Sequence, residues 1–551
     1  MTDNELTMLY RRLDAECGRA SDKLRSGREY EPYLFIPTHA AKEEHAKLLD
    51  SLMTRAQALP APDDVYALLK NHFIEYLDGK IGALDASYEA PAGFISAVTR
   101  FVGFISRKDS RFAEERAAIL TRRIGQVDEL WNAIRTLIPV TKTVHLKGLV
   151  MACDMLVQIC GINKPKVPEF YAGLPDKQLE EIASALDTLA AKATAWSAEA
   201  RKALEERPDA DQIDEFTVDY NVDKYRETLA NKYGVSLDKL VAMCEDEVVA
   251  TREEMFDIAE KIPGVKIPRT VQGVVDALNQ YAGPAKTADE MFARCRSYLA
   301  RAREGTRGYV LLPEEICRVV PMEEEGRAVN PWGGARGGCP RRKPLIGEMV
   351  LNPDNVPAIT DGWIKINALH EAYPGHHVQF VRTTSDPLPE TVREGARSTP
   401  LQEGTCLRTE RVFEFVFPED PFYPLFVAYR RHHGATRIKV DLYLHYYNRG
   451  FKDAMQLYID EMGFSEKSAT GQALGQVGVT GLGPGYFTTY YYGMKRIEEL
   501  QAQHGYDNKS FTELLFAPGR ISLKSFEAFL NLSEADRKRF LTRFDSLLPR
   551  G

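Results

Sequence analysis

The sequence predicts a mostly α-helical protein with two lobes, a deep central cleft and a very small β-sheet near residues 308–352. Three observations support this fold class. At 551 residues the chain is several times the length of an ordinary domain, so its core must be divided. Apolar residues recur every three or four positions through long stretches, which is the period of a helix. Short apolar runs typical of strands are confined to one region.

The N-terminal helical lobe is predicted to span residues 1–307, where helical stretches alternate with short breaks that contain proline or glycine. The second lobe, residues 308–551, begins with two strand candidates at residues 308–312 and 346–351. Helical periodicity returns after residue 364 and continues to the C-terminus. We expect the two lobes to form one cooperative unit.

Composition and charge exclude several classes of protein. A hydrophobic content of 44% with 27% charged residues is typical of a soluble globular chain. The net charge of -8 provides no basic field for nucleic acid or an anionic membrane. The N-terminus lacks the pattern of a signal peptide, and no uninterrupted apolar run approaches roughly 18 residues. The eight cysteines show no disulfide-like spacing. We therefore expect a cytoplasmic protein that binds neither nucleic acid nor membrane; a homodimer is left open.

The segment WIKINALHEAYPGHHVQF, residues 363–380, has the histidine density of a metal site. In H-E-x-x-H metallopeptidases, two histidines one helical turn apart bind zinc, and the adjacent glutamate takes a proton from the activated water. Here Pro374 stands four residues after His370, so the second ligand must be His376 or His377. Neither fits a straight helix, because i+6 points roughly 120° away and i+7 lies about 10 Å along the axis.

The Pro-Gly pair in this segment predicts a two-residue bulge. Pro374 lacks an N–H group and Gly375 tolerates unusual backbone angles. Such a bulge would bring His376 to the place of an i+4 ligand, and it leaves His377 as a supporting or substrate-contacting residue. A catalytic zinc needs a third protein ligand, for which Glu403, about 30 residues downstream, is the natural candidate. The alternative is a broken helix with surface histidines and a solvated glutamate.

Four segments together resemble the domain-of-unknown-function 885 family. These are HEAYPGHHVQ at residues 370–379, QEG at 402–404, TRIKVDLYLH at 436–445 and PGYFTTYYYG at 484–493, in the order the family has them. Members of this family look like gluzincin metallopeptidases with the helical architecture of angiotensin-converting enzyme and carboxypeptidase Taq. The resemblance covers residues 350–500 at the level of motifs.

The resemblance implies roles for single residues. His370, His376 and Glu403 would hold the metal, and Glu371 would be the general base. Tyr490, the first of three consecutive tyrosines that compete for the role, would stabilise the tetrahedral intermediate with its phenolic O–H. Zn²⁺ is preferred because two imidazoles and one carboxylate with an open position suit it, although Fe²⁺ and Mn²⁺ suit the same set.

Three further residues are candidates near the metal. Arg437, Asp441 and His445 fall at i, i+4 and i+8 on one helix face. They form either a structural ion-pair ladder or a set in which Arg437 meets a substrate carboxylate and His445 a developing oxyanion. The family commonly has Glu-Gly-Trp-Ala-Leu-Tyr after the third ligand, whereas this chain has Glu-Gly-Thr-Cys-Leu-Arg, which makes Arg408 a further candidate substrate contact.

The sequence thus predicts a zinc-dependent hydrolase that cleaves amide or peptide bonds through a metal-activated water. Short peptides or small amide-containing metabolites that carry a carboxylate are the expected substrates. One alternative is a metal-dependent lyase, dehydratase or tailoring enzyme that acts on a small amino-acid-like metabolite. Another is a catalytically silent binding relative.

Overall fold

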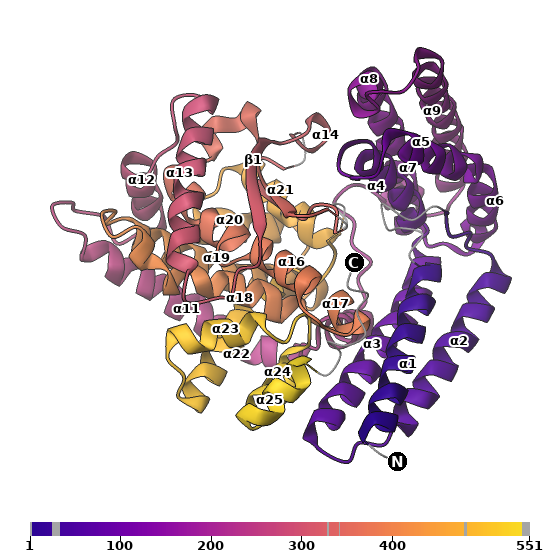
Figure 1. Cartoon of the computed structure of the whole chain (residues 1–551). Helices are drawn as coiled ribbons and strands as arrows, with labels where there is room; N and C mark the ends of the chain where they lie inside the picture. The colour runs from indigo at the N-terminus through magenta and orange to yellow at the C-terminus, as the bar shows by residue number, and fades with distance from the viewer. Residues whose placement is uncertain (1–2, 25–32, 328–329, 341, 479–481, 543–551) are drawn as a thin grey trace. The chain divides into compact units, whose positions relative to one another are not determined.

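A computed structural model describes residues 3–24, 33–327, 330–340, 342–478 and 482–542 (Figure 1). Within these ranges helices predominate, and the named strands form one small sheet. The predicted fold class, mostly α with a very small sheet, is confirmed.

The chain divides into two compact units. Unit 1 comprises Met1–Leu59 and Leu77–Thr217, and unit 2 comprises Pro60–Tyr76 and Val218–Gly551. The boundary expected at residue 307 falls inside unit 2. The physical reason is that helices before residue 307 pack on later ones, as α11 (Leu237–Glu260) does on α19 (Tyr423–His445).

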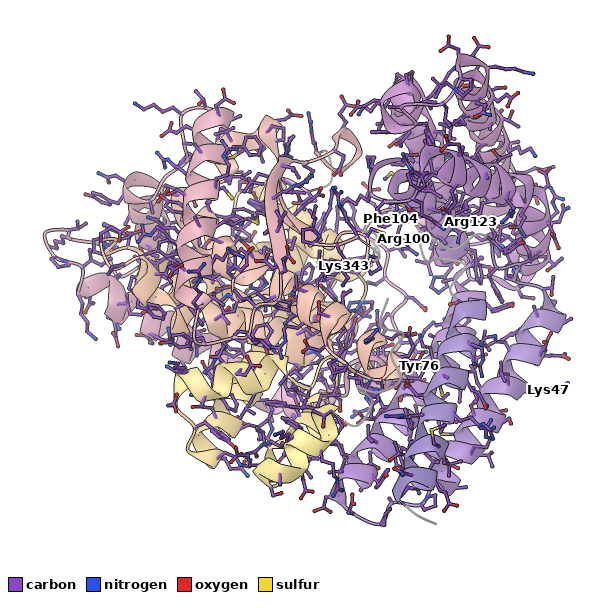
Figure 2. All side chains as sticks on the ribbon, in the orientation of Figure 1. Lys47, Tyr76, Arg100, Phe104, Arg123 and Lys343 are labelled. Carbon is purple, nitrogen blue, oxygen red and sulfur yellow. The ribbon has the colours of Figure 1, made fainter. Side chains whose placement is uncertain are left out.

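Unit 1 is a set of helices around an apolar core, in which α7 (Thr143–Asn163) packs against α4 and α9. Trp131 stacks on Trp196 with ring centroids 5.2 Å apart and an interplanar angle of 9°. Arg123, which is labelled in Figure 2, is a buried residue of this unit. Its guanidinium lies 3.9 Å from the ring centroid of Phe101, so an aromatic face covers the charge. The other helices are α1 (Asp3–Leu24), α2 (His39–Ala58), the second part of α3 (Asp64–Glu89), α4 (Ala92–Arg107), α5 (Ala113–Gly125), α6 (Val127–Leu137), α8 (Val167–Phe170) and α9 (Asp176–Glu205).

Unit 2 is organised around α19, which is buried along most of its length and packs against α11, α20 and α22. A second tight pair is formed by α18 (Thr399–Val412) and α22 (Thr488–His504). The other helices are the first part of α3, α10 (Val222–Thr228), α12 (Val271–Tyr281), α13 (Ala288–Thr306), α14 (Glu324–Arg327), α15 (Asp361–Asn367), α16 (His376–Ser385), α17 (Glu390–Glu394), α20 (Phe451–Met462), α21 (Glu466–Val477), α23 (Asn508–Phe516), α24 (Leu523–Asn531) and α25 (Glu534–Thr542).

The sheet of unit 2 has three strands, β1 (Glu315–Pro321), β2 (Gly333–Arg336) and β3 (Leu345–Leu351), in the order β1-β3-β2. β1 runs parallel to β3, and β2 runs antiparallel to it. The prediction of a strand at residues 308–312 was wrong, since that run precedes β1 and forms no strand. β2 was not predicted, because its glycine-rich sequence has little strand propensity. It forms a strand through its antiparallel pairing with β3.

One stretch of unit 1, Thr143–Phe170, is long and apolar enough to span a bilayer when length and composition alone are considered. A core helix of a water-soluble protein meets the same criteria. Leu146, Leu149 and Leu156 of this stretch are buried in the core of unit 1.

Candidate functional site

The histidine-rich segment adopts a helix, a turn and a second helix. After α15, one π-helical turn covers Ala368–Ala372 and carries His370, and α16 begins at His376. The chain folds back so tightly between them that a Cβ on Gly375 would come within 1.8 Å of the carbonyl oxygen of His370. A break between two helices thus replaces the expected two-residue bulge, and it brings the two imidazoles face to edge with centroids 5.1 Å apart.

Glu403 of α18 lies against both histidines. Its Oε2 is 3.1 Å from Nε2 of His376 and 3.7 Å from Nε2 of His370. Burial alone would raise the pKa of Glu403, but the two imidazoles outweigh burial and hold that pKa well below its usual range. The structure therefore brings together two ring nitrogens and a carboxylate, which is the donor set of many catalytic zinc sites.

The opposite ring nitrogens of these histidines are held by other oxygens. Nδ1 of His370 lies 2.8 Å from Oε1 of Glu410, and Nδ1 of His376 lies 2.9 Å from Oε1 of Gln379. An oxygen at Nδ1 favours a proton there, so a cation that displaced the proton from Nε2 would meet the lone pair of that nitrogen. Glu410 and Gln379 were missed by sequence reasoning. The signal for Glu410 was its position two turns after Glu403 on one helix.

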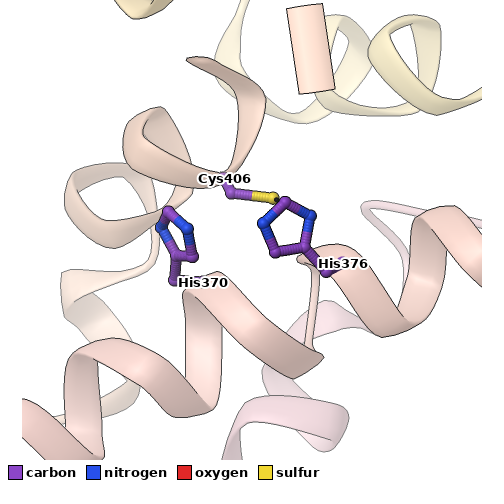
Figure 3. Close-up of side chains that lie close together, drawn as sticks. All are labelled: His370, His376 and Cys406. Carbon is purple, nitrogen blue, oxygen red and sulfur yellow. Dashed lines mark hydrogen bonds between the residues drawn. The ribbon is translucent and has the colours of Figure 1, made fainter. Parts of the chain in front are cut away.

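Cys406 is a third neighbour of the histidines that was not predicted. Figure 3 shows its sulfur directed towards the ring of His376. One nitrogen of each of His370 and His376 and the Cys406 sulfur lie within 4.8 Å of one another, and the sulfur is 3.5 Å from Nδ1 of His376. Burial raises the pKa of the Cys406 thiol to about 11. The site thus contains a second donor set, His/His/Cys, whose thiol is protonated at neutral pH.

Glu371 is half-buried and lies beside the outer edge of the sheet. Its Oε2 accepts a hydrogen bond of 2.9 Å from the backbone N–H of Ala335 in β2. β2 is an edge strand, and this N–H points away from β3 towards the histidine segment. The carboxylate next to His370 is therefore oriented by a backbone group.

Two tyrosines line the same cluster, Tyr486 from the segment before α22 and Tyr490 from its first turn. The ring of Tyr490 is nearly parallel to that of His370, with centroids 6.0 Å apart. Its hydroxyl lies 3.4 Å from the hydroxyl of Tyr486, which donates a 2.8 Å hydrogen bond to Oε1 of Glu403. The neighbouring Tyr491 instead donates to Glu247. Of the competing tyrosines, Tyr490 faces the histidines, and Tyr486 was missed.

Arg437 is buried, and no carboxylate of the described residues pairs with it. Its guanidinium lies 4.3 Å from the ring centroid of Phe487 and 5.2 Å from that of Tyr490. It donates to the neutral Oε1 of Gln472 at 2.9 Å, while its Nε has no hydrogen-bond partner among the described residues. Burial lowers the pKa of Arg437.

Of the two alternatives for the stripe on α19, the ion-pair ladder does not form among the described residues. Asp441 accepts hydrogen bonds from Gln476 at 2.8 Å and from Thr488 at 2.6 Å, and burial raises its pKa to about 7. Nε2 of His445 lies 2.9 Å from the carbonyl oxygen of Gln476, and burial lowers its pKa to about 4. His445 thus contacts Gln476 of α21 and the ring of Tyr225 in α10, and it is not part of the histidine cluster.

Two residues predicted to contact the substrate, His377 and Arg408, instead bind other side chains of the protein. Nε2 of His377 lies 2.5 Å from Oε2 of Glu315, and both side chains are buried. Arg408 is 1% exposed, and burial lowers its pKa to about 10. Its guanidinium donates to side-chain oxygens of α22 and α23, namely those of Gln501, Asn508 and Thr512. The structure does not bring Arg408 to the histidine cluster.

Comparison with known proteins gives a family and a fold. The sequence family described as "Bacterial protein of unknown function (DUF885)" matches residues 26–529. None of the curated proteins matches the chain. The structure of "the putative lipoprotein from Colwellia psychrerythraea" is similar with a TM-score of 0.77 and 15% identity, over 96% of this chain and 99% of that one. "A putative lipoprotein of unknown function from Shewanella oneidensis" has a TM-score of 0.69 and 15% identity, over 95% of this chain and 98% of that one.

Proposed function

Because the chain belongs to the bacterial DUF885 family, whose function is unknown, we propose its function from the site itself. The proposal is a metal-dependent hydrolase that cleaves amide or peptide bonds of short peptides or small amide-containing metabolites. One observation carries it: Nε2 of His370 and Nε2 of His376 both face Glu403, while Glu410 and Gln379 hold the opposite nitrogens. The predicted relation to gluzincin peptidases belongs to this proposal.

The metal would be held by His370, His376 and Glu403. Glu403 fits better than Cys406, since it is ionised and lies on the Nε2 side of both rings, whereas the protonated thiol lies at Nδ1 of His376. Zn²⁺ is the proposed ion, with Fe²⁺ or Mn²⁺ as alternatives for the same donors. When bound, such an ion supplies a Lewis acid for a carbonyl group and makes a water molecule more acidic.

The proton transfers fall to Glu371, which adjoins His370 in the chain. Its carboxylate would accept the proton of the attacking water and pass it to the leaving nitrogen. The N–H of Ala335 keeps one carboxylate oxygen in place, so the other is available for the water. Tyr490 would donate its O–H to the oxygen that gains negative charge, because within the described part of the chain its hydroxyl has only a long contact, with Tyr486.

The substrate would carry a carboxylate, and Arg437 is the reason. A buried guanidinium is costly unless an anion pairs with it, and among the described residues no carboxylate lies within 4 Å of Arg437. Its stacking on Tyr490 places this cation beside the residue that faces His370. A short substrate could therefore meet the histidine cluster with its amide and Arg437 with its carboxylate.

Metal analysis of the purified protein tests this proposal. We expect one metal ion per chain in the wild type and in the control His39→Ala, which changes an exposed histidine of unit 1. His370→Ala and His376→Ala should both lose the ion. A wild type without metal, or a His370→Ala protein that keeps it, would contradict the proposed centre.

The reaction class is tested by incubation with N-acyl amino acids and peptides in ¹⁸O-labelled water. Hydrolysis places one solvent oxygen in the acid product, whereas a lyase or dehydratase reaction leaves that label out. Metal binding without turnover of any substrate would instead favour a silent binding protein.

The location of the protein is a separate proposal. The cytoplasmic location inferred from the sequence stays a prediction. Because two proteins of the same fold are described as lipoproteins, attachment at a membrane surface is the alternative that a cell-fractionation experiment should compare with it.

A further inference from the structure

The candidate ligands His370 and His376 lie on two helices, so no continuous helix sets their relative position. They are joined by the turn at residues 373–375. Other contacts must therefore hold the second helix, which starts at His376, against the first. Tyr373 is the first residue of this turn and His377 is the second residue of the helix that follows it, and Glu315 of the small sheet contacts both.

The first contact comes from Glu315 at the start of β1. Its side chain is fully buried, and Oε2 accepts a 2.6 Å hydrogen bond from Tyr373 and lies 2.5 Å from Nε2 of His377. Oε1 accepts a 2.8 Å bond from Nε of Arg303. One carboxylate oxygen thus contacts both the first residue of the turn and the second residue of α16.

The second contact comes from Gly347 in β3, which pairs with Cys317 of β1. A Cβ at position 347 would lie 2.2 Å from Nδ1 of His377, so the imidazole rests directly on the backbone of the strand. That Nδ1 is buried and has no hydrogen-bond partner among the described residues. Glycine is needed at 347 because any side chain would push His377 away from Glu315.

The third contact comes from β2, where the N–H of Ala335 holds Glu371. A Cβ on the preceding Gly334 would lie 4.0 Å from Oε1 of Glu371, which is ordinary contact distance. All three strands therefore reach the segment from Glu371 to His377: β1 and β3 contact opposite ring nitrogens of His377, and β2 contacts Glu371.

From these contacts we infer that the three-stranded sheet positions the candidate metal centre, with Glu315 and Gly347 as positioning residues that act through His377 on the adjacent ligand His376. Neither residue touches the proposed ion. This inference rests on the proposed function, because it assumes that His376 is a ligand.

The test measures the affinity of the full-length protein for zinc by competition with a chelator. Glu315→Gln keeps the shape of the side chain but removes the charge that holds His377 and Arg303. Gly347→Ala places a methyl group where the imidazole lies. Both should weaken zinc binding on the order of tenfold or more, the range found when groups that orient metal ligands are changed.

Two controls separate positioning from general stability. Gly471→Ala changes a glycine of α21 with nothing within 4 Å of the added Cβ, and it should leave zinc affinity unchanged. His377→Ala should itself weaken binding, and adding Gly347→Ala to it should cause no further loss, because the ring that the methyl group displaces is gone.

The outcomes distinguish this inference from the proposed function. A wild type that binds no zinc would overturn both. Normal zinc binding by the wild type together with unchanged affinity in Glu315→Gln would overturn the positioning role alone, even if Gly347→Ala failed to fold. The positioning role would also be overturned if Glu315→Gln and Gly347→Ala lowered the melting temperature of the zinc-free protein without changing its zinc affinity. A zinc affinity of the double variant His377→Ala/Gly347→Ala below that of His377→Ala would overturn it as well.

Discussion

Replacing Glu410 by glutamine tests how the cluster prepares His370 for a metal. Oε1 of Glu410 lies 2.8 Å from Nδ1 of His370, and both side chains are almost fully buried. The change converts a charge-assisted hydrogen bond, worth about 1.5–3 kcal/mol, into a neutral one of about 0.5–1.5 kcal/mol. The difference of roughly 1–1.5 kcal/mol corresponds to about a tenfold loss of affinity for zinc.

The assay is titration of the zinc-free protein against a chelator of known affinity, with the melting temperature measured in parallel. Glu414→Gln is the matched control, because Glu414 follows on the same stretch of chain and is not bonded to His370. Glu410→Gln should bind zinc about tenfold more weakly and still fold, whereas the control should bind normally. Equal affinity in wild type and Glu410→Gln would refute the view that this carboxylate prepares the ligand.

Four further predictions concern single side chains. Glu371→Gln should keep zinc and lose on the order of two to four decades in turnover, and full turnover in the zinc-loaded variant would exclude it as general base. Cys406→Ala should keep zinc and Glu403→Ala should lose it; the reverse would assign the third ligand to the thiol. Arg437→Ala should lower kcat/KM for a substrate with a free carboxylate by a factor that corresponds to about 2 kcal/mol, and it should barely change kcat/KM for the amide of that substrate. Equal losses of kcat/KM for the two substrates would make the arginine structural. Burial raises the pKa of Asp441 from 3.8 to about 7, so the folded state binds the extra proton and stability from this group falls as pH rises between those values. Asp441→Asn should therefore flatten the decline in unfolding free energy over that window, and an unchanged profile would contradict the shift.

Several features could be predicted from local sequence alone. Apolar residues at helical spacing indicated a mostly helical chain, because that period directly reflects which side of a helix is buried. The short runs near residues 308–352 indicated a small sheet, and the strand at 345–351 was found nearly to the residue. The histidine spacing around Pro374 and Gly375 showed that an ordinary helix could not bring two ligands together.

Only the tertiary structure decided how the candidate site is completed. Glu410, Cys406 and Tyr486 join it from α18 and from the segment before α22. The helical spacing of Glu410 from Glu403 hinted at a shared face, but spacing within α18 does not show which histidine Glu410 or Cys406 contacts. Asp441 stands at the right spacing to pair with Arg437, yet its oxygens are taken by α21 and α22. Periodicity in a sequence reports neighbours within one element, whereas these contacts depend on how elements far apart in the chain pack. For the same reason, only the packing of α16 against β3 shows that the imidazole of His377 lies against the backbone of Gly347.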